Sequence, residues 1–149
     1  MQPCRSSSRR YTQRFAASVL RRLRSNRRRL PIILALAGEL GSGKTTFVQG
    51  LARSLGIREN VQSPTFVLAK WYRLPLRQRP FRNFIHIDAY RLNTAEARRL
   101  GFPATLRDRG AIVAIEWADR IKRLIPKHTA WVFFEHKSEN KRHISIKMN

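Results

Sequence analysis

Residues 31–56, PIILALAGELGSGKTTFVQGLARSLG, decide the fold of this chain. The stretch begins with a continuous apolar run at 31–37, which is typical of a strand buried on both faces of a parallel sheet. A glycine-rich turn follows at 38–43, and apolar residues then recur at helical spacing as far as Gly56, where we expect the helix to end. Strand, glycine loop and helix in this order predict an α/β domain with a phosphate-binding loop.

The glycine-rich turn carries the first chemical signal. GELGSGKT at 38–45 matches the phosphate-loop pattern G-x-x-x-x-G-K-[ST] at every fixed position. Glycines let backbone N–H groups wrap a phosphate chain, and the helix that follows adds the positive end of its dipole. Lys44 supplies a charge for the β- and γ-phosphates, and the Thr45 hydroxyl is a ligand for Mg²⁺. The predicted nucleotide-binding residues here are Glu39, Leu40, Gly41, Ser42, Gly43, Lys44, Thr45 and Thr46.

A second anchor for Mg²⁺ is expected from an acid at the end of a buried strand. Two acids fit, because Glu116 directly follows the apolar run AIVAI and Asp88 directly follows NFIHI. We assign Glu116 to the metal together with Thr45, and Asp88 to a supporting position or to the orientation of the attacking water. The reverse assignment stays open. His86 shares a strand face with Asp88, and we interpret it as a packed core residue rather than a catalyst.

The remaining segments alternate between short strands and helices. The predicted strands are 65–72, 83–87, 111–115, 131–136 and 143–147, with a loop at 73–82, a short helix at 94–100 and a polar turn around 137–142. We expect a three-layer α/β/α domain of the P-loop NTPase type, with a mixed, largely parallel sheet and a C-terminal β-hairpin.

The N-terminal segment is basic and has two parts. Residues 1–10, MQPCRSSSRR, are predicted to be a disordered tail, so that a single domain spans 11–149. A helical apolar stripe then begins, and its members are Tyr11, Phe15, Ala16, Val19, Leu20 and Leu23. Such an arginine-rich stretch is compatible with an organelle transit peptide. We favour the first helix of the domain, because the stripe leads almost directly into the first core strand.

Composition limits the possible classes of protein. The chain has 149 residues, with 31 Lys and Arg against 9 Asp and Glu, for a net charge of +22. One cysteine, Cys4, excludes an internal disulfide and any zinc site built on cysteine pairs. An apolar run of about 18 residues is missing, so we expect no membrane-spanning helix and no membrane partner. The charge favours polyanionic partners, although base composition of the genome also explains an arginine excess.

Four blocks together resemble one family. In chain order they are GELGSGKTTFVQGL from Gly38, SPTF at 63–66, HIDAYRL at 86–92 and IEW at 115–117. This ordered set is similar to the TsaE (YjeE) family, the P-loop ATPase of bacterial tRNA threonylcarbamoyladenosine modification. The resemblance covers about residues 11 to 147. One departure is that the family has a short strand before its first helix, whereas residues 1–10 show no strand alternation.

The resemblance implies a specific site. It implies ATP, with Mg²⁺ held by Thr45 and Glu116, and Trp117 beside the nucleotide. It implies a switch role for Thr65 near the γ-phosphate, and it makes Asp88 important for turnover. The residues expected to carry the chemistry are Lys44, Thr65, Asp88 and Glu116.

The resemblance also implies partners and a location. A TsaD-like transferase and a TsaB-like protein are the expected partners, and ATP hydrolysis, slow in the isolated chain, would drive turnover of their complex. Contact with tRNA is expected to be indirect, or direct through the basic surface. The implied location is the cytoplasm.

Two other functions fit parts of the sequence. A small P-loop kinase of a nucleoside or metabolite would use the arginine-rich loop at 73–82 as a lid, but it gives no reason for the other three blocks. A basic RNA-binding module with a vestigial phosphate loop would explain the charge, but the loop and both strand-end acids are intact. RNA binding that survives Lys44→Ala would support the second alternative.

Overall fold

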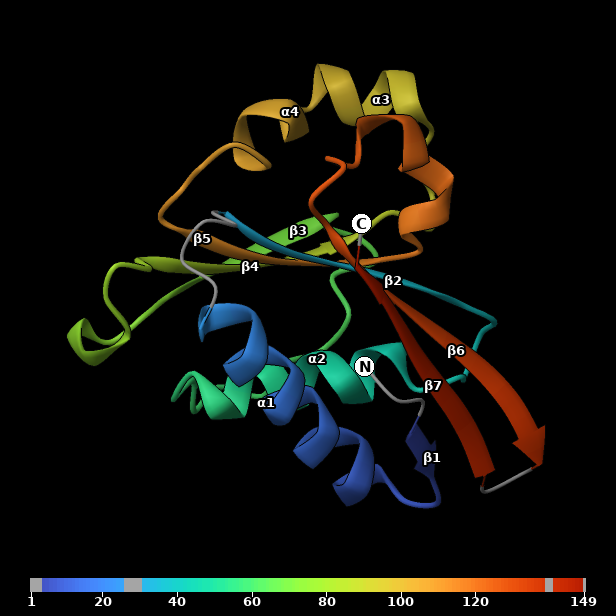
Figure 1. Ribbon diagram of the computed structural model, residues 1–149. Helices are drawn as coiled ribbons and strands as arrows, with labels where there is room; N and C mark the ends of the chain where they lie inside the picture. Colours follow the sequence, from blue (N-terminus) through green and yellow to red (C-terminus); the bar gives the residue numbers. More distant parts are fainter. Residues whose placement is uncertain (1–3, 26–30, 139–140, 149) are drawn as a thin grey trace.

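The computed structural model describes residues 4–25, 31–138 and 141–148, which form a seven-stranded sheet between two layers of helices (Figure 1). The strands are β1 (Cys4–Ser6), β2 (Ile32–Gly38), β3 (Ala69–Arg73), β4 (Asn83–Asp88), β5 (Ala111–Glu116), β6 (Ala130–Ser138) and β7 (Lys141–Met148). The α-helices are α1 (Arg9–Ser25), α2 (Lys44–Ser54), α3 (Thr94–Arg99) and α4 (Phe102–Thr105), and the 3-10 helices are η1 (Leu76–Gln78) and η2 (Ala118–Leu124).

The sheet is parallel in its centre and antiparallel at its edges. Its strand order is β1-β7-β6-β2-β5-β4-β3. β2 lies between β5 and β6 and is parallel to both, and β4 is parallel to β5. β3 is antiparallel to β4, and β6 and β7 form an antiparallel hairpin. The predicted mixed sheet with a C-terminal hairpin is therefore confirmed.

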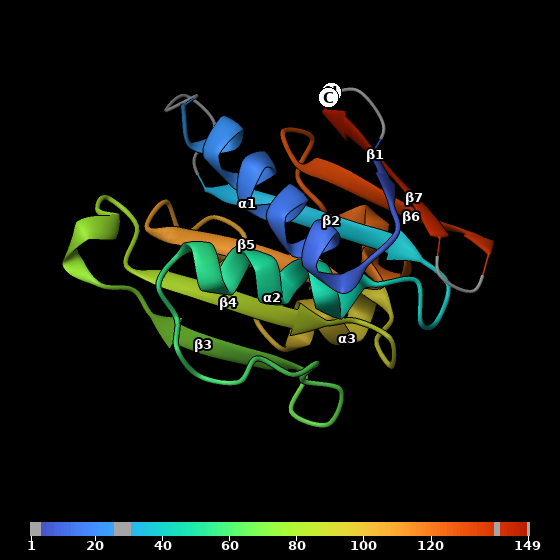
Figure 2. The same cartoon turned by 90° about the horizontal axis from the view of Figure 1, so that it is seen from below.

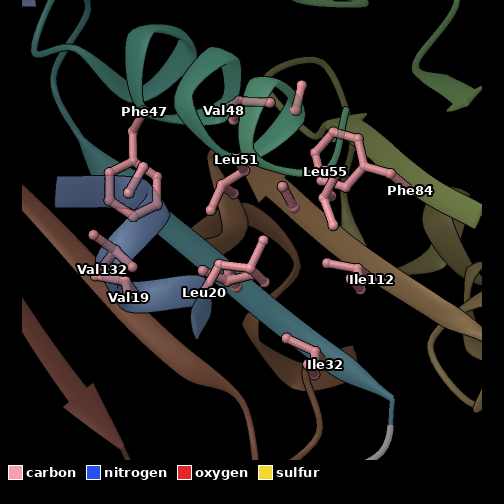
Figure 3. Close-up of a cluster of buried hydrophobic side chains, with 14 of the residues drawn as sticks. Val19, Leu20, Ile32, Phe47, Val48, Leu51, Leu55, Phe84, Ile112 and Val132 are labelled. Carbon is pink, nitrogen blue, oxygen red and sulfur yellow. The ribbon is translucent and has the colours of Figure 1, made fainter. Parts of the chain in front are cut away.

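Helices cover both faces of this sheet. α1 and α2 lie side by side on one face, while α3, α4 and η2 lie on the other (Figures 1 and 2). Side chains from α1, α2 and the central strands meet in one apolar core, as Figure 3 shows for Val19, Leu51 and Ile112. A second core lies beneath α3, α4 and η2. β2 and β5 contribute to both cores, which explains their uninterrupted apolar sequences.

The prediction of a disordered tail was wrong for residues 4–10. Cys4–Ser6 form β1, which pairs antiparallel with β7, and α1 begins at Arg9. Cys4 and Ser6 are buried whereas Arg5 is exposed, which is the alternation of a strand. Three residues in a polar segment are too few for this pattern to predict a strand from the sequence. The Ser6 hydroxyl lies 2.7 Å from the Thr12 hydroxyl, which ties β1 to the helix. Residues 1–3 lie outside the described residues.

Two other local expectations needed adjustment, and one helix was not expected. The predicted strand at 65–72 begins only at Ala69, because 65–67 form a turn in which the Leu68 N–H donates to the Pro64 carbonyl at 2.7 Å. α4 was not expected from the sequence. The predicted turn around 137–142 is shorter, since β6 extends to Ser138 and β7 begins at Lys141, and residues 139–140 lie outside the described residues.

Candidate nucleotide-binding site

The phosphate loop joins the end of β2 to the start of α2. Gly43 has φ +102° and immediately precedes the helix, and Gly41 also has a positive φ of +73°. Gly38 has no room for a side chain, because a Cβ there would lie 2.6 Å from the Phe134 carbonyl oxygen of β6. These positions require glycine, so the backbone curves around the N-terminus of α2, where the first N–H groups have no partner within the helix. That arrangement is suited to binding an anion.

Lys44, the first residue of α2, is buried beside this loop. Its amino group donates to the carbonyl oxygens of Gly38 at 2.7 Å and Glu39 at 2.8 Å. The same nitrogen lies 3.8 Å from the centre of the Trp117 ring, a cation–π distance. Burial lowers the pKa of Lys44, while the nearby carboxylates of Glu116, Asp119 and Asp88 oppose that change.

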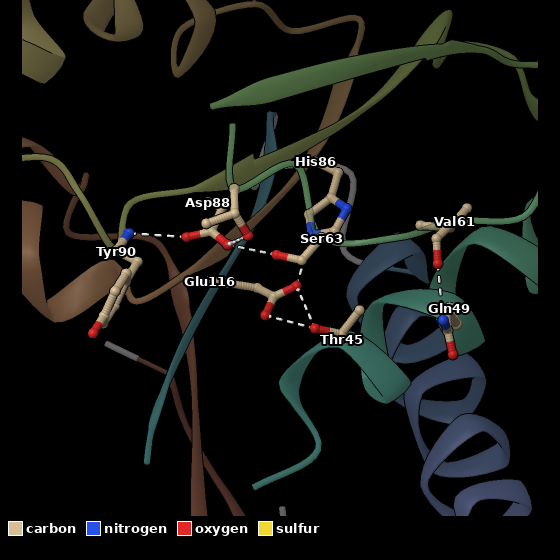
Figure 4. Close-up of polar contacts among 9 residues, drawn as sticks. Thr45, Gln49, Val61, Ser63, His86, Asp88, Tyr90 and Glu116 are labelled. Carbon is tan, nitrogen blue, oxygen red and sulfur yellow. Dashed lines mark hydrogen bonds and ion pairs between the residues drawn. The ribbon is translucent and has the colours of Figure 1, made fainter. Parts of the chain in front are cut away.

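Thr45, Glu116 and His86 form a chain of polar contacts at the strand ends (Figure 4). The Thr45 hydroxyl lies 3.0 Å from Oε1 and 2.9 Å from Oε2 of Glu116. His86 is fully buried, and its Nε2 lies 2.8 Å from Glu116 Oε1. Because a carboxylate only accepts hydrogen bonds, the Nε2 atom carries the proton of this contact. The prediction that His86 is packed in the core is confirmed, but it also contacts the predicted metal ligand.

Asp88 organises the segment that precedes β3. Its Oδ2 atom accepts hydrogen bonds from the hydroxyls of Ser63 and Thr65, the latter at 3.1 Å. Its Oδ1 atom accepts the Tyr90 N–H at 2.9 Å. Asp88 and Glu116 are directly paired in the parallel register of β4 and β5, so the two acids end neighbouring strands side by side.

Most of these groups, but not the buried His86, line one pocket of about 360 Å³. Of the predicted site residues, those that line it are Leu40, Gly41, Ser42, Gly43, Lys44, Thr45, Thr46, Thr65, Asp88, Glu116 and Trp117. Glu39 is the exception: it does not line the pocket, and its carbonyl oxygen accepts from the Lys44 amino group and from the Ser42 N–H. Ser63 and Tyr90 also line the pocket and were not proposed as site residues, although both belong to motif blocks quoted from the sequence.

The C-terminal hairpin reaches the phosphate loop from the other side. A Cβ on Gly43 would lie 3.1 Å from Nη1 of Arg142 in β7, and one on Gly41 would lie 4.0 Å from Nε2 of His136 in β6. The Nε of Arg142 is buried and has no hydrogen-bond partner among the described residues. Arg142 is therefore a cation placed against the loop. The sequence does not single out Arg142, because nothing local distinguishes it from the other arginines.

Comparison with known proteins identifies the family. The family model described as "Threonylcarbamoyl adenosine biosynthesis protein TsaE" matches residues 6–144, which include all four sequence blocks and the strands that carry the site. The chain belongs to the TsaE family. The predicted resemblance is thereby confirmed, and it connects the chain with threonylcarbamoyladenosine biosynthesis.

Individual TsaE proteins agree with this assignment. The relative from Bacillus subtilis is 34% identical over 117 residues, which are 76% of this chain and 68% of the relative. The relative from Rickettsia typhi is 34% identical over 143 residues, 95% of this chain and 91% of the relative. The Synechocystis relative is 39% identical, but the match spans 59% of its length. Each is named as a tRNA threonylcarbamoyladenosine biosynthesis protein TsaE.

A solved structure supports the fold of this TsaE-family chain. The crystal structure of Bacillus subtilis YdiB superposes with a TM-score of 0.71 and 23% sequence identity, covering 99% of this chain and 84% of that one. In the part of the chain that the structure describes, no helix is both long and apolar enough to cross a membrane.

Proposed function

We propose that this TsaE-family chain binds ATP with Mg²⁺ in the pocket at the strand ends, and that it hydrolyses ATP as an accessory step of tRNA threonylcarbamoyladenosine formation. The observation that carries the proposal is the contact of the Thr45 hydroxyl with both carboxylate oxygens of Glu116, 71 residues away. Together with a complete phosphate loop, this pair has the composition of a nucleotide-bound magnesium site.

The residues present fit a magnesium ion. Mg²⁺ prefers hard oxygen ligands, keeps several waters and is usually held by one or two carboxylates together with substrate phosphates. Thr45 and Glu116 supply a hydroxyl and a carboxylate at one point of the pocket. No cluster of three or more His, Cys, Asp or Glu side chains suited to a metal occurs in the described part of the chain. When bound, the ion would neutralise charge that develops on the transferred phosphoryl group.

The other site residues have separate roles in this proposal. The loop backbone and Lys44 bind the phosphates, and His86 holds the Glu116 carboxylate by its hydrogen bond. Asp88 accepts hydrogen bonds from Ser63 and Thr65 at the pocket, so residues 63–66 would lie beside the reacting phosphate. Arg142 adds a positive charge at the start of α2.

The rim of the pocket is the surface we assign to the protein partners. Leu40 (84% exposed) and Tyr90 (47%) line the pocket, and Phe66 (86%) and Val67 (69%) directly follow Thr65, which also lines it. Exposed apolar groups gathered at one place are typical of protein–protein contact. We assign this rim to a complex of a TsaD-like transferase and a TsaB-like protein in the cytoplasm. Contact there would complete the site, so hydrolysis by the isolated chain is expected to be slow.

The test is ATP turnover with and without a purified TsaB–TsaD-type pair, for the native chain and for Glu116→Ala. We expect the pair to stimulate the native chain and Glu116→Ala to abolish turnover in both conditions. Failure of the pair to stimulate, with stimulation by RNA or by a small nucleoside instead, would overturn the assigned partners.

A matched pair of surface variants tests the rim. Phe66→Ser removes an exposed aromatic side chain at the rim, and Trp71→Ser removes one that is 54% exposed on β3. Stimulation by the protein pair, measured relative to each variant's own basal rate, should fall for Phe66→Ser and persist for Trp71→Ser. Equal loss in both variants would place the partners elsewhere.

A further inference from the structure

One face of α1 carries a row of arginines that the proposed ATPase site does not use. Arg10, Arg14 and Arg21 are all exposed. At 3.6 residues per turn they lie within about 40° of one another around the helix, and they extend about 16 Å along its axis. Each therefore faces solvent on the same side of the molecule.

The positive charge of α1 is not compensated within the described residues. The helix contains no acidic residue, and none of the ion pairs in the described ranges includes one of its side chains. Its first turn is basic, which the helix dipole disfavours, and like charges four residues apart repel. Neighbouring guanidinium groups bond to neutral amides, in the pairs Arg9–Gln49, Arg24–Gln78 and Arg53–Gln13.

The packing of α1 on α2 extends the basic face. The two helices lie side by side (Figure 2). They approach closely at Gly50, where a Cβ would lie 2.5 Å from the Gln13 carbonyl oxygen. Grooves open on either side of this crossing. One is lined by Arg21 and Arg24, and the other by Arg9, Arg53 and Arg58. Glu59 is the one acid that lines either groove, and it is paired with Lys70 at 3.2 Å.

The chemistry of this face fits nucleic acid better than protein. Guanidinium groups bind phosphate oxygens through two parallel N–H donors, and binding is strengthened by release of counterions. A protein interface needs an apolar centre, but α1 carries a single large exposed apolar side chain. Tyr11 is the large exposed apolar residue of α1.

We propose that the exposed arginine face of α1, with the two grooves beside α2, is an RNA-binding surface that contacts the sugar–phosphate backbone. It lies on the outer side of the α1–α2 layer, whereas the apolar rim surrounds the nucleotide pocket. RNA and the protein partners would therefore occupy different parts of the molecule. Because the surface contacts phosphates rather than bases, RNA binding should depend strongly on salt concentration and weakly on the RNA sequence.

The test measures binding of an unmodified tRNA transcript by fluorescence anisotropy over a series of salt concentrations, without ATP. The variant is the triple substitution Arg10→Gln, Arg14→Gln and Arg21→Gln, which keeps good helix formers. The matched control is Arg98→Gln, Arg99→Gln and Arg107→Gln, three exposed arginines on the opposite helical layer with the same change in charge.

We expect the α1 variant to lose at least about tenfold in affinity at low salt, and its slope of log K against log salt to fall by about 2 to 3. The control variant should keep the native slope of log K against log salt within about 1. Replacing Arg10, Arg14 and Arg21 by lysine should give a slope close to that of the native chain. Thermal melting confirms that each variant is folded. Omitting ATP separates this result from failure of the proposed ATPase function.

Two outcomes would overturn the proposal. An equal loss of RNA affinity in the α1 and control variants would mean that binding depends only on the total net charge of the protein. No measurable RNA binding by the native chain, together with α1-dependent binding of poly-glutamate, would assign the face to an acidic protein instead.

Discussion

The Thr45 hydroxyl lies within 3.0 Å of both carboxylate oxygens of Glu116, although the two residues are 71 positions apart. Thr45 is in the first turn of α2, and Glu116 ends β5. The contact therefore joins the phosphate loop to the neighbouring strand. It also gives the pocket a place where a hydroxyl and a carboxylate can share one cation.

Removal of the Glu116 charge should reduce ATP hydrolysis strongly while leaving metal-free nucleotide binding nearly unchanged. Glu116→Gln keeps the shape of the side chain but supplies a poor ligand for Mg²⁺. We expect turnover to fall by at least about 100-fold, while nucleotide affinity without Mg²⁺ changes by less than about threefold. Steady-state turnover and binding of a fluorescent ATP analogue measure both effects. Glu135→Gln, on an exposed part of β6, is the matched control. Unchanged turnover in Glu116→Gln would contradict the metal assignment.

His86 should stabilise the folded protein and the metal site together. Its Nε2–H donates to Glu116 at 2.8 Å, and His86→Leu leaves this buried carboxylate with one donor fewer. We expect a loss of about 1–3 kcal/mol in the free energy of unfolding by urea, together with weaker Mg²⁺ binding. His86→Gln carries an N–H donor and should recover part of both. A loss of stability without any effect on Mg²⁺ binding would make His86 a packing residue only.

Asp88 should control the segment that contains Ser63 and Thr65. Asp88→Ala removes the acceptor for both hydroxyls and for the Tyr90 N–H. We expect faster proteolytic cleavage between residues 61 and 68, and turnover reduced by at least about tenfold. Ser63→Ala removes one of the three bonds and should give an intermediate cleavage rate. Protection equal to that of the native chain would show that other contacts hold the segment.

The lowered pKa of Lys44 predicts a pH dependence of nucleotide binding. Burial moves this pKa below its ordinary value near 10.5, and phosphate binding needs the protonated amine. Affinity should therefore fall as the pH rises through the lowered pKa, sooner than for an exposed lysine. In the nucleotide-free protein, the pKa of Lys44 is lower in the folded state than in the unfolded chain, so the folded state binds this proton less tightly. The contribution of Lys44 to stability should therefore increase over the same pH interval.

A titration of ATP-analogue affinity from pH 7 to about 10 tests this dependence. Lys44→Arg is the comparison, since a guanidinium group stays protonated throughout. Its affinity is expected to be lower but nearly independent of pH. The same decline in both proteins would assign the effect to another group.

Gly50 should be essential for the close approach of α1 and α2. A Cβ at this position would meet backbone atoms of Gln13 at 2.5 and 2.6 Å. Alanine normally favours a helix by about 1 kcal/mol over glycine, but here the clash should dominate and cost about 1–3 kcal/mol. Gly101→Ala is the comparison, because no atom lies within 4 Å of its added Cβ and only its φ of +79° opposes the change. Urea unfolding measures both, and a stabilising Gly50→Ala would show that the helices separate without cost.

The local patterns of the sequence predicted most of the elements. A continuous apolar run predicted β2 because a strand buried on both faces must be apolar throughout. The glycine loop and the helix after it follow from backbone freedom and helical periodicity, which act over a few residues. The four blocks also predicted the family, and Glu116 and Asp88 were recognised because acids directly after buried strands are conspicuous.

Only the tertiary structure decided which distant groups meet. The register of β4 against β5 places Asp88 beside Glu116, and the fold brings His86 and Thr45 to the same carboxylate. Arg142 reaches Gly43 through the pairing of β6 and β7 with the rest of the sheet. β1 was missed because its stability comes from pairing with β7 rather than from its own three residues. Local propensities cannot encode such contacts, because they depend on strand register and side-chain packing between segments far apart in the chain.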